Sequence, residues 1–177
     1  MHPTMQDLET ELTGSLTGLT AAQTLATPPG HPEKWCIQEI VGHLLLSYAS
    51  TTQLFESRIE KGRATRSKPT LPQRLGQFYI LTLKRFPGGH RAPDAVCPPA
   101  PCPTCNGAAL VRRVHTELAL LDAAMDRAVS LFGDAPAISH VSLGPLPVDR
   151  WRTFHLVHGR HHIHQILALR VPLAAAG

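Results

Sequence analysis

Histidine is unusually frequent in this sequence, and its positions are clustered. The chain of 177 residues contains 11 His, and five of them fall between His155 and His164. His158 and His162 are four residues apart, so in a helix both rings project from one face and can reach the same ion. The spacing alone is weak evidence, because a His on an apolar helix face is usually a hydrogen-bonded core residue.

A third imidazole would have to come from another part of the chain. His43 lies on the flank of an apolar stripe, beside Ile40 and Ser47. An i, i+4 pair from one helix and a His from another form an open site, with positions free for water or substrate. His43 is thus a candidate for the third ligand beside His158 and His162, although spacing alone would not single it out. Three imidazoles suit Zn, Ni or Fe(II) and do not distinguish among them.

Four long segments with few helix breakers are expected to position these residues. Apolar side chains recur in them at spacings of three and four, which is the period of one helical face. The predicted helices are Thr4–Ala26, Cys36–Gly62, Asn106–Phe132 and a last one that starts at Pro147. On the last helix one inward face, about a third of the circumference, carries Trp151, Phe154, His155, His158, His162, Gln165, Ile166 and Leu169.

A Pro-rich crossover separates the second and third of these helices. It spans residues 63–104 and contains one extra predicted helix, Leu71–Arg85, before a Pro-rich stretch that cannot continue a helix. Strand-like alternation is found only at Ile138–Leu143, and it is weak. We therefore predict an all-α fold, a four-helix bundle that forms a single domain over residues 1–177 and in which the second and third helices run parallel.

Composition narrows the class of protein. No apolar run reaches the roughly 18 residues of a membrane-spanning helix, and the first residues lack a secretory signal. We therefore expect a cytoplasmic protein without a membrane partner. The net charge is +4, and the segment from Arg58 to Arg91 holds nine Lys or Arg and one acid, Glu60. Such a segment attracts anions, although a solvated helix end is the ordinary interpretation.

Two segments of the chain resemble the DinB/YfiT-like superfamily. The first runs from Trp35 to Leu44 and includes His43. The second runs from Leu143 through Trp151 to Gln165, and its His-x-x-His-His-x-x-Gln pattern is most similar to the DUF1569 branch. Arg85-Phe86-Pro87 and Ala92-Pro93 are also similar to the crossover of that branch.

The resemblance implies an up-down-down-up bundle whose second and fourth helices supply three His ligands of one divalent metal ion, His43, His158 and His162. It implies a homodimer as well. It also implies thiol chemistry, because several members are bacillithiol transferases or the mycothiol-dependent maleylpyruvate isomerase. Our leading expectation is thus a metal-dependent S-transferase that takes a small-molecule substrate and a low-molecular-weight thiol. His155, His161 and Gln165 are candidates for orienting the ligands, and the catalytic general base is not identifiable.

Alternatives to this function remain open at the level of the sequence. A hydrolase would use water in place of the thiol, and a non-catalytic stress-response protein would only bind. Nucleic acid is not expected as a partner, since no aromatic platform accompanies the basic segment.

The cysteines leave two further alternatives open. Cys36, at a helix start, could be a reactive thiol, or it could be an ordinary cap substitution. Cys97, Cys102 and Cys105 could form a zinc clip, but a second C-x2-C pair is missing.

Overall fold

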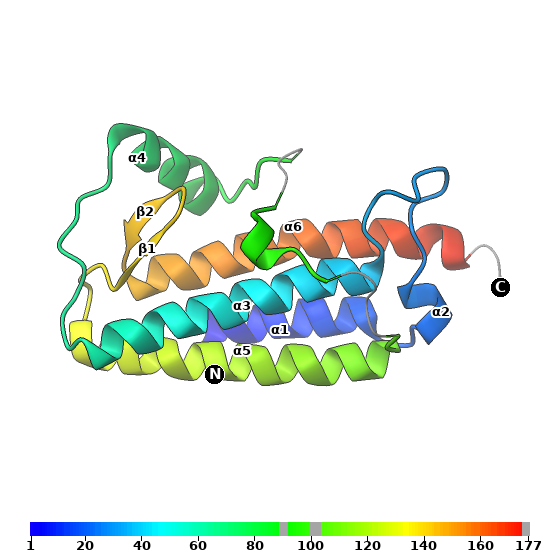
Figure 1. Cartoon of the computed structure of the whole chain (residues 1–177), viewed down its shortest axis with the longest axis horizontal. Helices are drawn as coiled ribbons and strands as arrows, with labels where there is room; N and C mark the ends of the chain where they lie inside the picture. The colour runs from blue at the N-terminus through cyan, green and yellow to red at the C-terminus, as the bar shows by residue number, and fades with distance from the viewer. Residues whose placement is uncertain (89–91, 100–103, 175–177) are drawn as a thin grey trace.

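The computed structural model describes residues 1–88, 92–99 and 104–174, with side chains described up to Arg170. This part of the chain is mostly helical, as the sequence predicted. Its longest helices lie side by side along the long axis of the molecule (Figure 1) and are α1 (Pro3–Leu16), α3 (Ile37–Glu60), α5 (Gly107–Phe132) and α6 (Val148–Ala174).

The core lies where these long helices meet. Helix α3 packs against α5 and α6, and α1 packs against α5 and α6. The predicted leucine stripe of α1 is fully buried at Leu8, Leu12 and Leu16. Helix α5 agrees with the predicted helix Asn106–Phe132 to within one residue. The Asn106 side chain caps it by accepting a hydrogen bond from the Ala109 N–H at 2.9 Å, and Gly133 follows the last residue.

The first predicted helix, Thr4–Ala26, is wrong in its second half. Helix α1 ends at Leu16, and a separate short helix α2 (Ala21–Thr24) follows it. Gly18 lies between them with a φ of 79°, a left-handed conformation that a helix interior does not contain. Thr20 then caps α2, and its N–H donates to Gln23 Oε1 at 2.9 Å. Local capping chemistry therefore outweighs the apolar periodicity here.

The crossover contains the predicted extra helix and one more turn. Helix α4 (Leu71–Gln77) begins as predicted and continues into the π turn η1 (Phe78–Thr82), so the helix stops before Arg85. Lys84, with a φ of 53°, lies in the left-handed region that ends the helical path. A short 3-10 helix, η2 (Asp94–Val96), then lies against α3.

A small hairpin precedes the last helix. Strand β1 (Ile138–His140) pairs antiparallel with β2 (Gly144–Leu146), and Ile138 lies opposite Leu146. The weak alternation at Ile138–Leu143 thus indicated the first strand but not the pair. Within the described residues, none of the helices combines the length and apolar character that crossing a membrane would require.

Candidate metal centre

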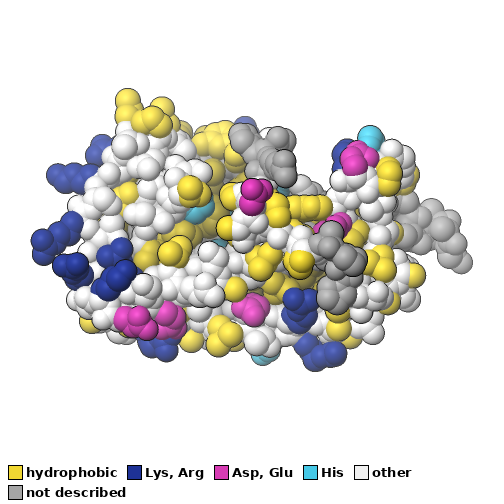
Figure 2. Space-filling model, viewed as in Figure 1, with side chains coloured by type: hydrophobic (Ala, Val, Ile, Leu, Met, Phe, Trp, Pro, Cys, Tyr) yellow, Lys and Arg dark blue, Asp and Glu magenta, His cyan; other side chains and the backbone are white. Residues whose placement is uncertain are grey.

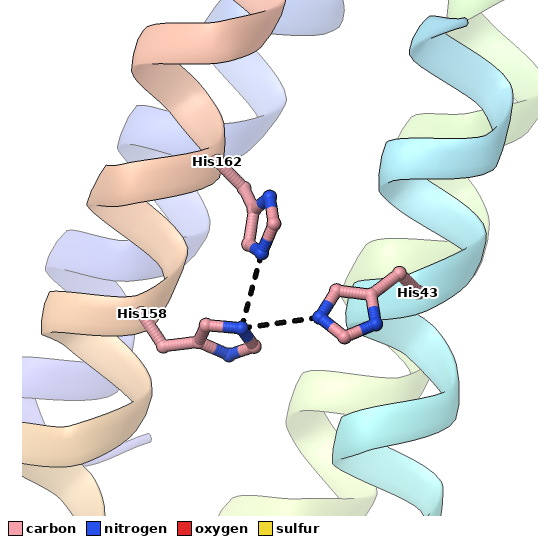
Figure 3. Close-up of side chains that lie close together, drawn as sticks. All are labelled: His43, His158 and His162. Atoms are coloured by element: carbon pink, nitrogen blue, oxygen red, sulfur yellow. Dashed lines mark hydrogen bonds between the residues drawn. The ribbon is translucent and has the colours of Figure 1, made fainter. Parts of the chain in front are cut away.

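The predicted ligands meet between α3 and α6. His43 projects from α3, and His158 and His162 project from α6 toward it (Figure 3). The Nε2 atom of His158 lies 3.1 Å from Nε2 of His43 and 3.1 Å from Nε2 of His162. Ligand atoms of the three side chains all lie within 4.8 Å of one another. Two nitrogens on a tetrahedral zinc ion are about 3.3 Å apart, so the spacing is close to that of metal ligands.

Hydrogen bonds at Nδ1 orient the rings of His43 and His162. Nδ1 of His43 lies 2.9 Å from the Val96 carbonyl oxygen, and Nδ1 of His162 lies 2.8 Å from Gln165 Oε1. Both oxygens only accept hydrogen bonds, so each Nδ1 carries the hydrogen and each Nε2 presents its lone pair. This is the arrangement in which metal-binding histidines are usually held.

The Nε2 atoms at the centre of the cluster cannot all be hydrogen-bonded to one another. The neutral His158 ring has a single N–H, whereas the Nε2 atoms of His43 and His162 both need a donor. The Nδ1 atom of His158 is buried and has no hydrogen-bond partner. His43, His158 and His162 are only 5%, 6% and 7% exposed, so water does not easily supply the missing hydrogen-bond donors. A divalent cation would bind all three lone pairs, and the donor set therefore fits a metal ion.

Electrostatics keeps these imidazoles neutral. Burial lowers the pKa of His43 below its usual value, and burial together with the neighbouring histidines lowers that of His158 much further. Burial, followed by the effect of His43, lowers the pKa of His162 to about 4. Neutral imidazole is the form that binds metals, so the cluster is ready to coordinate an ion near neutral pH.

The Pro-rich crossover contributes a backbone atom to the site. A Cβ atom at Gly42 would lie 3.1 Å from Cβ of Pro98, so the absence of a side chain allows the crossover to approach α3 closely. This approach brings the Val96 carbonyl to His43. No side-chain pattern marks a backbone acceptor, which explains why the sequence did not indicate Val96.

Aromatic rings enclose the histidines. The ring centroid of Trp35 is 5.3 Å from that of His43, and the centroids of Phe86 and Phe154 are 4.9 and 5.5 Å from that of His158. Trp35 and Phe86 are half-buried, so the cluster lies one layer below the surface. Apolar walls of this kind limit the access of water and favour binding of the less polar part of a ligand.

Of the three residues predicted to orient the ligands, two are hydrogen-bonded to the cluster, directly or through a neighbour, and one is not. Gln165 contacts His162 and also donates from Nε2 to Nε2 of His161 at 3.1 Å. His155 is buried against Tyr48 and Trp151, and neither of its ring nitrogens has a hydrogen-bond partner. Gln165 thus supports a ligand directly, His161 supports it through Gln165, and no hydrogen bond links His155 to the cluster.

The cysteines do not add a second site to the described chain. Burial raises the pKa of the Cys36 thiol, which favours the ordinary cap substitution over the reactive thiol. The cap itself is present, because the Cys36 N–H donates to a Glu39 carboxylate oxygen at 2.8 Å. Cys97 and Cys105 are free thiols, and Cys102 lies outside the described residues. Among the described side chains, only the three histidines gather as a potential metal site.

Comparisons with models of known protein families, with curated proteins and with solved structures find no match for this chain. The interpretation of the site therefore depends on its own geometry and chemistry.

Proposed function

We propose that this chain is a metal-dependent protein of the DinB-like type that holds one divalent cation on His43, His158 and His162. The observation that carries the proposal is the convergence of three buried, neutral imidazoles on one point. Two of them have Nδ1 bound to an oxygen, which leaves Nε2 free to coordinate. A cluster built only for packing would not need three lone pairs directed at the same place.

The course of the chain supports the DinB-like fold in this proposal. In Figure 1 the colour of α3 and of α5 progresses in the same direction along the molecule, and that of α1 and α6 progresses in the other. Parallel second and third long helices, joined by a crossover that contains α4, are what an up-down-down-up four-helix bundle requires.

The reaction class that we propose is S-transfer with a low-molecular-weight thiol. A divalent cation lowers the pKa of a thiol or a water molecule that binds to it, and so supplies a nucleophile near neutral pH. The chain itself holds the rings of His43 and His162 in place through Val96 and Gln165. Trp35 and Phe86 limit water beside the cluster and would contact an apolar substrate group.

Elemental analysis of the purified protein tests metal binding. We expect about one equivalent of a divalent metal per chain in the wild type, and its loss in His158→Ala, because three protein ligands are the usual minimum for such a site. His164→Ala is the matched control, since this residue lies on the same helix but is exposed. Equal metal content in His158→Ala and wild type would refute the proposed site.

A transfer assay tests the reaction class separately. The metal-loaded protein is incubated with an electrophilic substrate, with and without bacillithiol, mycothiol or glutathione. We expect turnover only in the presence of a thiol, and its loss in His158→Ala but not in His164→Ala. Turnover without any thiol would instead identify a hydrolase, and metal binding without turnover would leave only the binding function.

A further inference from the structure

The helix α4 and the turn η1 are oriented with their polar side toward the protein. Gln77 donates from Nε2 to the Leu143 carbonyl oxygen at 2.7 Å. Gln73 also lies against the hairpin, because a Cβ atom at Gly144 would be 2.4 Å from its Oε1. A surface helix normally turns its apolar side inward, so this orientation is the reverse of the ordinary one.

Large apolar side chains cover the opposite, outward side. Leu71 is 71% exposed, Leu75 is 64% exposed and Phe78 is 55% exposed. Their spacing of four and three residues places them on one helical face, and Tyr79, 41% exposed, lies beside them. Ile80 and Leu81 are buried and anchor the segment to the core, and η1 packs on α6. We call Leu71, Leu75, Phe78 and Tyr79 the outer apolar face.

Positive charge lies beside the outer apolar face. From residue 58 to residue 88 the chain has a single acid, Glu60, and eight cations, namely Arg58, Lys61, Arg63, Arg66, Lys68, Arg74, Lys84 and Arg85. No ion pair in the described chain involves any of these cations. Figure 2 shows Lys and Arg gathered at the end of the molecule beside α4, next to hydrophobic side chains on the outer side of α4.

An open pocket adds a place for an anionic group at the same end. Its volume is about 230 Å³, and Arg58, Arg63 and Arg66 line it together with Ala64. Arg58 lies 15 residues beyond His43 on helix α3, which corresponds to about 22 Å along the helix. The pocket therefore cannot contribute to binding a small ligand at the histidine cluster, and the basic residues that line it need another explanation.

We propose that the outer apolar face docks on an anionic lipid surface. A helix with Leu and Phe on one side and Lys or Arg around it is the type that lies in the interface of a membrane. Tyr is also favoured at this depth, and anionic headgroups attract each cation near the surface. A helix that lies on a membrane surface needs neither a spanning segment nor a secretory signal, so the absence of an apolar spanning run does not exclude it.

The charge distribution favours lipid over a second copy of the chain. In a two-fold symmetric dimer the same face meets itself, so the eight cations of each copy would lie near those of the other. Like charges in this arrangement repel, whereas an anionic bilayer attracts them all. A homodimer, as the resemblance implies, would thus use another face.

Vesicle co-sedimentation of the full chain tests the proposal. We use vesicles of phosphatidylcholine with phosphatidylglycerol, and vesicles of phosphatidylcholine alone, at low and high salt. We expect binding to the mixed vesicles at low salt, weaker binding at high salt, and little binding to phosphatidylcholine alone. The double variant Leu75→Ser/Phe78→Ser should bind at least about tenfold more weakly. Arg74→Glu/Lys84→Glu should reduce binding to the mixed vesicles as well.

Matched control variants distinguish a loss of vesicle binding specific to the outer apolar face from the general effect of substituting any exposed leucine or cation. Leu120→Ser/Leu167→Ser removes two other exposed leucines, 53% and 44% exposed, and Arg112→Glu/Arg113→Glu changes two exposed cations of α5. Both controls should bind like the wild type. Circular dichroism and thermal melting check that each variant is folded. The proposal is overturned if wild type binds neither vesicle, or if face and control variants bind equally. A dimer abolished by Leu75→Ser/Phe78→Ser, without vesicle binding, would assign the face to a second copy instead.

Discussion

At the scale of single residues, the partners of both ring nitrogens decide what each histidine can do. His43 and His162 have an oxygen at Nδ1, and His158 has none. His155 is as deeply buried as the ligands but has no hydrogen bond at either nitrogen. Histidines on α6 therefore differ in role, because Nε2 of His158 lies 3.1 Å from Nε2 of His43 and of His162, whereas neither ring nitrogen of His155 has a partner.

The first prediction at this scale concerns Gln165. Gln165→Leu removes the acceptor of the His162 N–H, so the ring is less firmly oriented. We expect metal affinity to fall about 10- to 100-fold, as for other residues that support a ligand. Competition with a chelator of known affinity measures it, with His164→Ala as the control on the same helix. Unchanged affinity in Gln165→Leu would show that this hydrogen bond does not support the site.

The second prediction concerns the buried hydroxyl of Tyr48. The side chain is fully buried, its Oη has no hydrogen-bond partner, and burial raises its pKa. Tyr48→Phe removes the unsatisfied group and keeps the ring. We expect the free energy of unfolding to rise by about 1 kcal/mol in chemical denaturation. Tyr79→Phe, at an exposed position, should change little. A clear loss of stability in Tyr48→Phe would mean that its hydroxyl is hydrogen-bonded in solution.

At the scale of elements, caps and glycines determine where the helices begin and end. Asn106 and Gly133 bound α5 as its sequence predicts, and Glu39 completes the cap of α3. The break between α1 and α2 follows from the left-handed φ of Gly18 together with the cap at Thr20. Apolar side chains keep the helical spacing through this break, so the helix predicted from that spacing was too long.

A pair of glycine substitutions tests this account of the break. Gly14 lies exposed inside α1, and Gly18 lies at the break with a φ of 79°. A Cβ atom would meet nothing within 4 Å at either position, so only the backbone distinguishes them. Gly14→Ala should raise the free energy of unfolding by about 0.5–1 kcal/mol. Gly18→Ala should lower it by about 1–2 kcal/mol. Changes of the same sign in urea denaturation would contradict the account.

At the scale of the whole molecule, burial of neutral histidines makes stability depend on pH. Burial lowers the pKa of His140 to about 4 and that of His155 to about 3. In the unfolded chain their pKa is about 6.5, so acid protonates the unfolded state first. This stability is fully present above about pH 6.5 and is lost as the pH falls through the folded-state values.

Urea denaturation of the metal-free protein between pH 7 and pH 4 measures this dependence. We expect the free energy of unfolding to fall with acid, by up to about 1.4 kcal/mol per pH unit for each such histidine. His155→Leu should reduce the slope of unfolding free energy against pH by about that amount, because unfolding then takes up one proton fewer. His164→Ala, at an exposed position, should leave the slope unchanged. An identical slope in His155→Leu and wild type would show that His155 titrates normally.

The amino-acid sequence alone determined the features that depend on neighbours along the chain. These are the approximate extents of the long helices and the one-turn spacing of His158 and His162, because helical hydrogen bonds and periodicity are local. Tertiary structure alone decided which distant groups meet. The meeting of His43 with His158, 115 residues apart, was expected only through the family resemblance. The Val96 carbonyl at His43 and the outward orientation of the α4 leucines were not predicted. These outcomes depend on packing between elements, which no local pattern encodes.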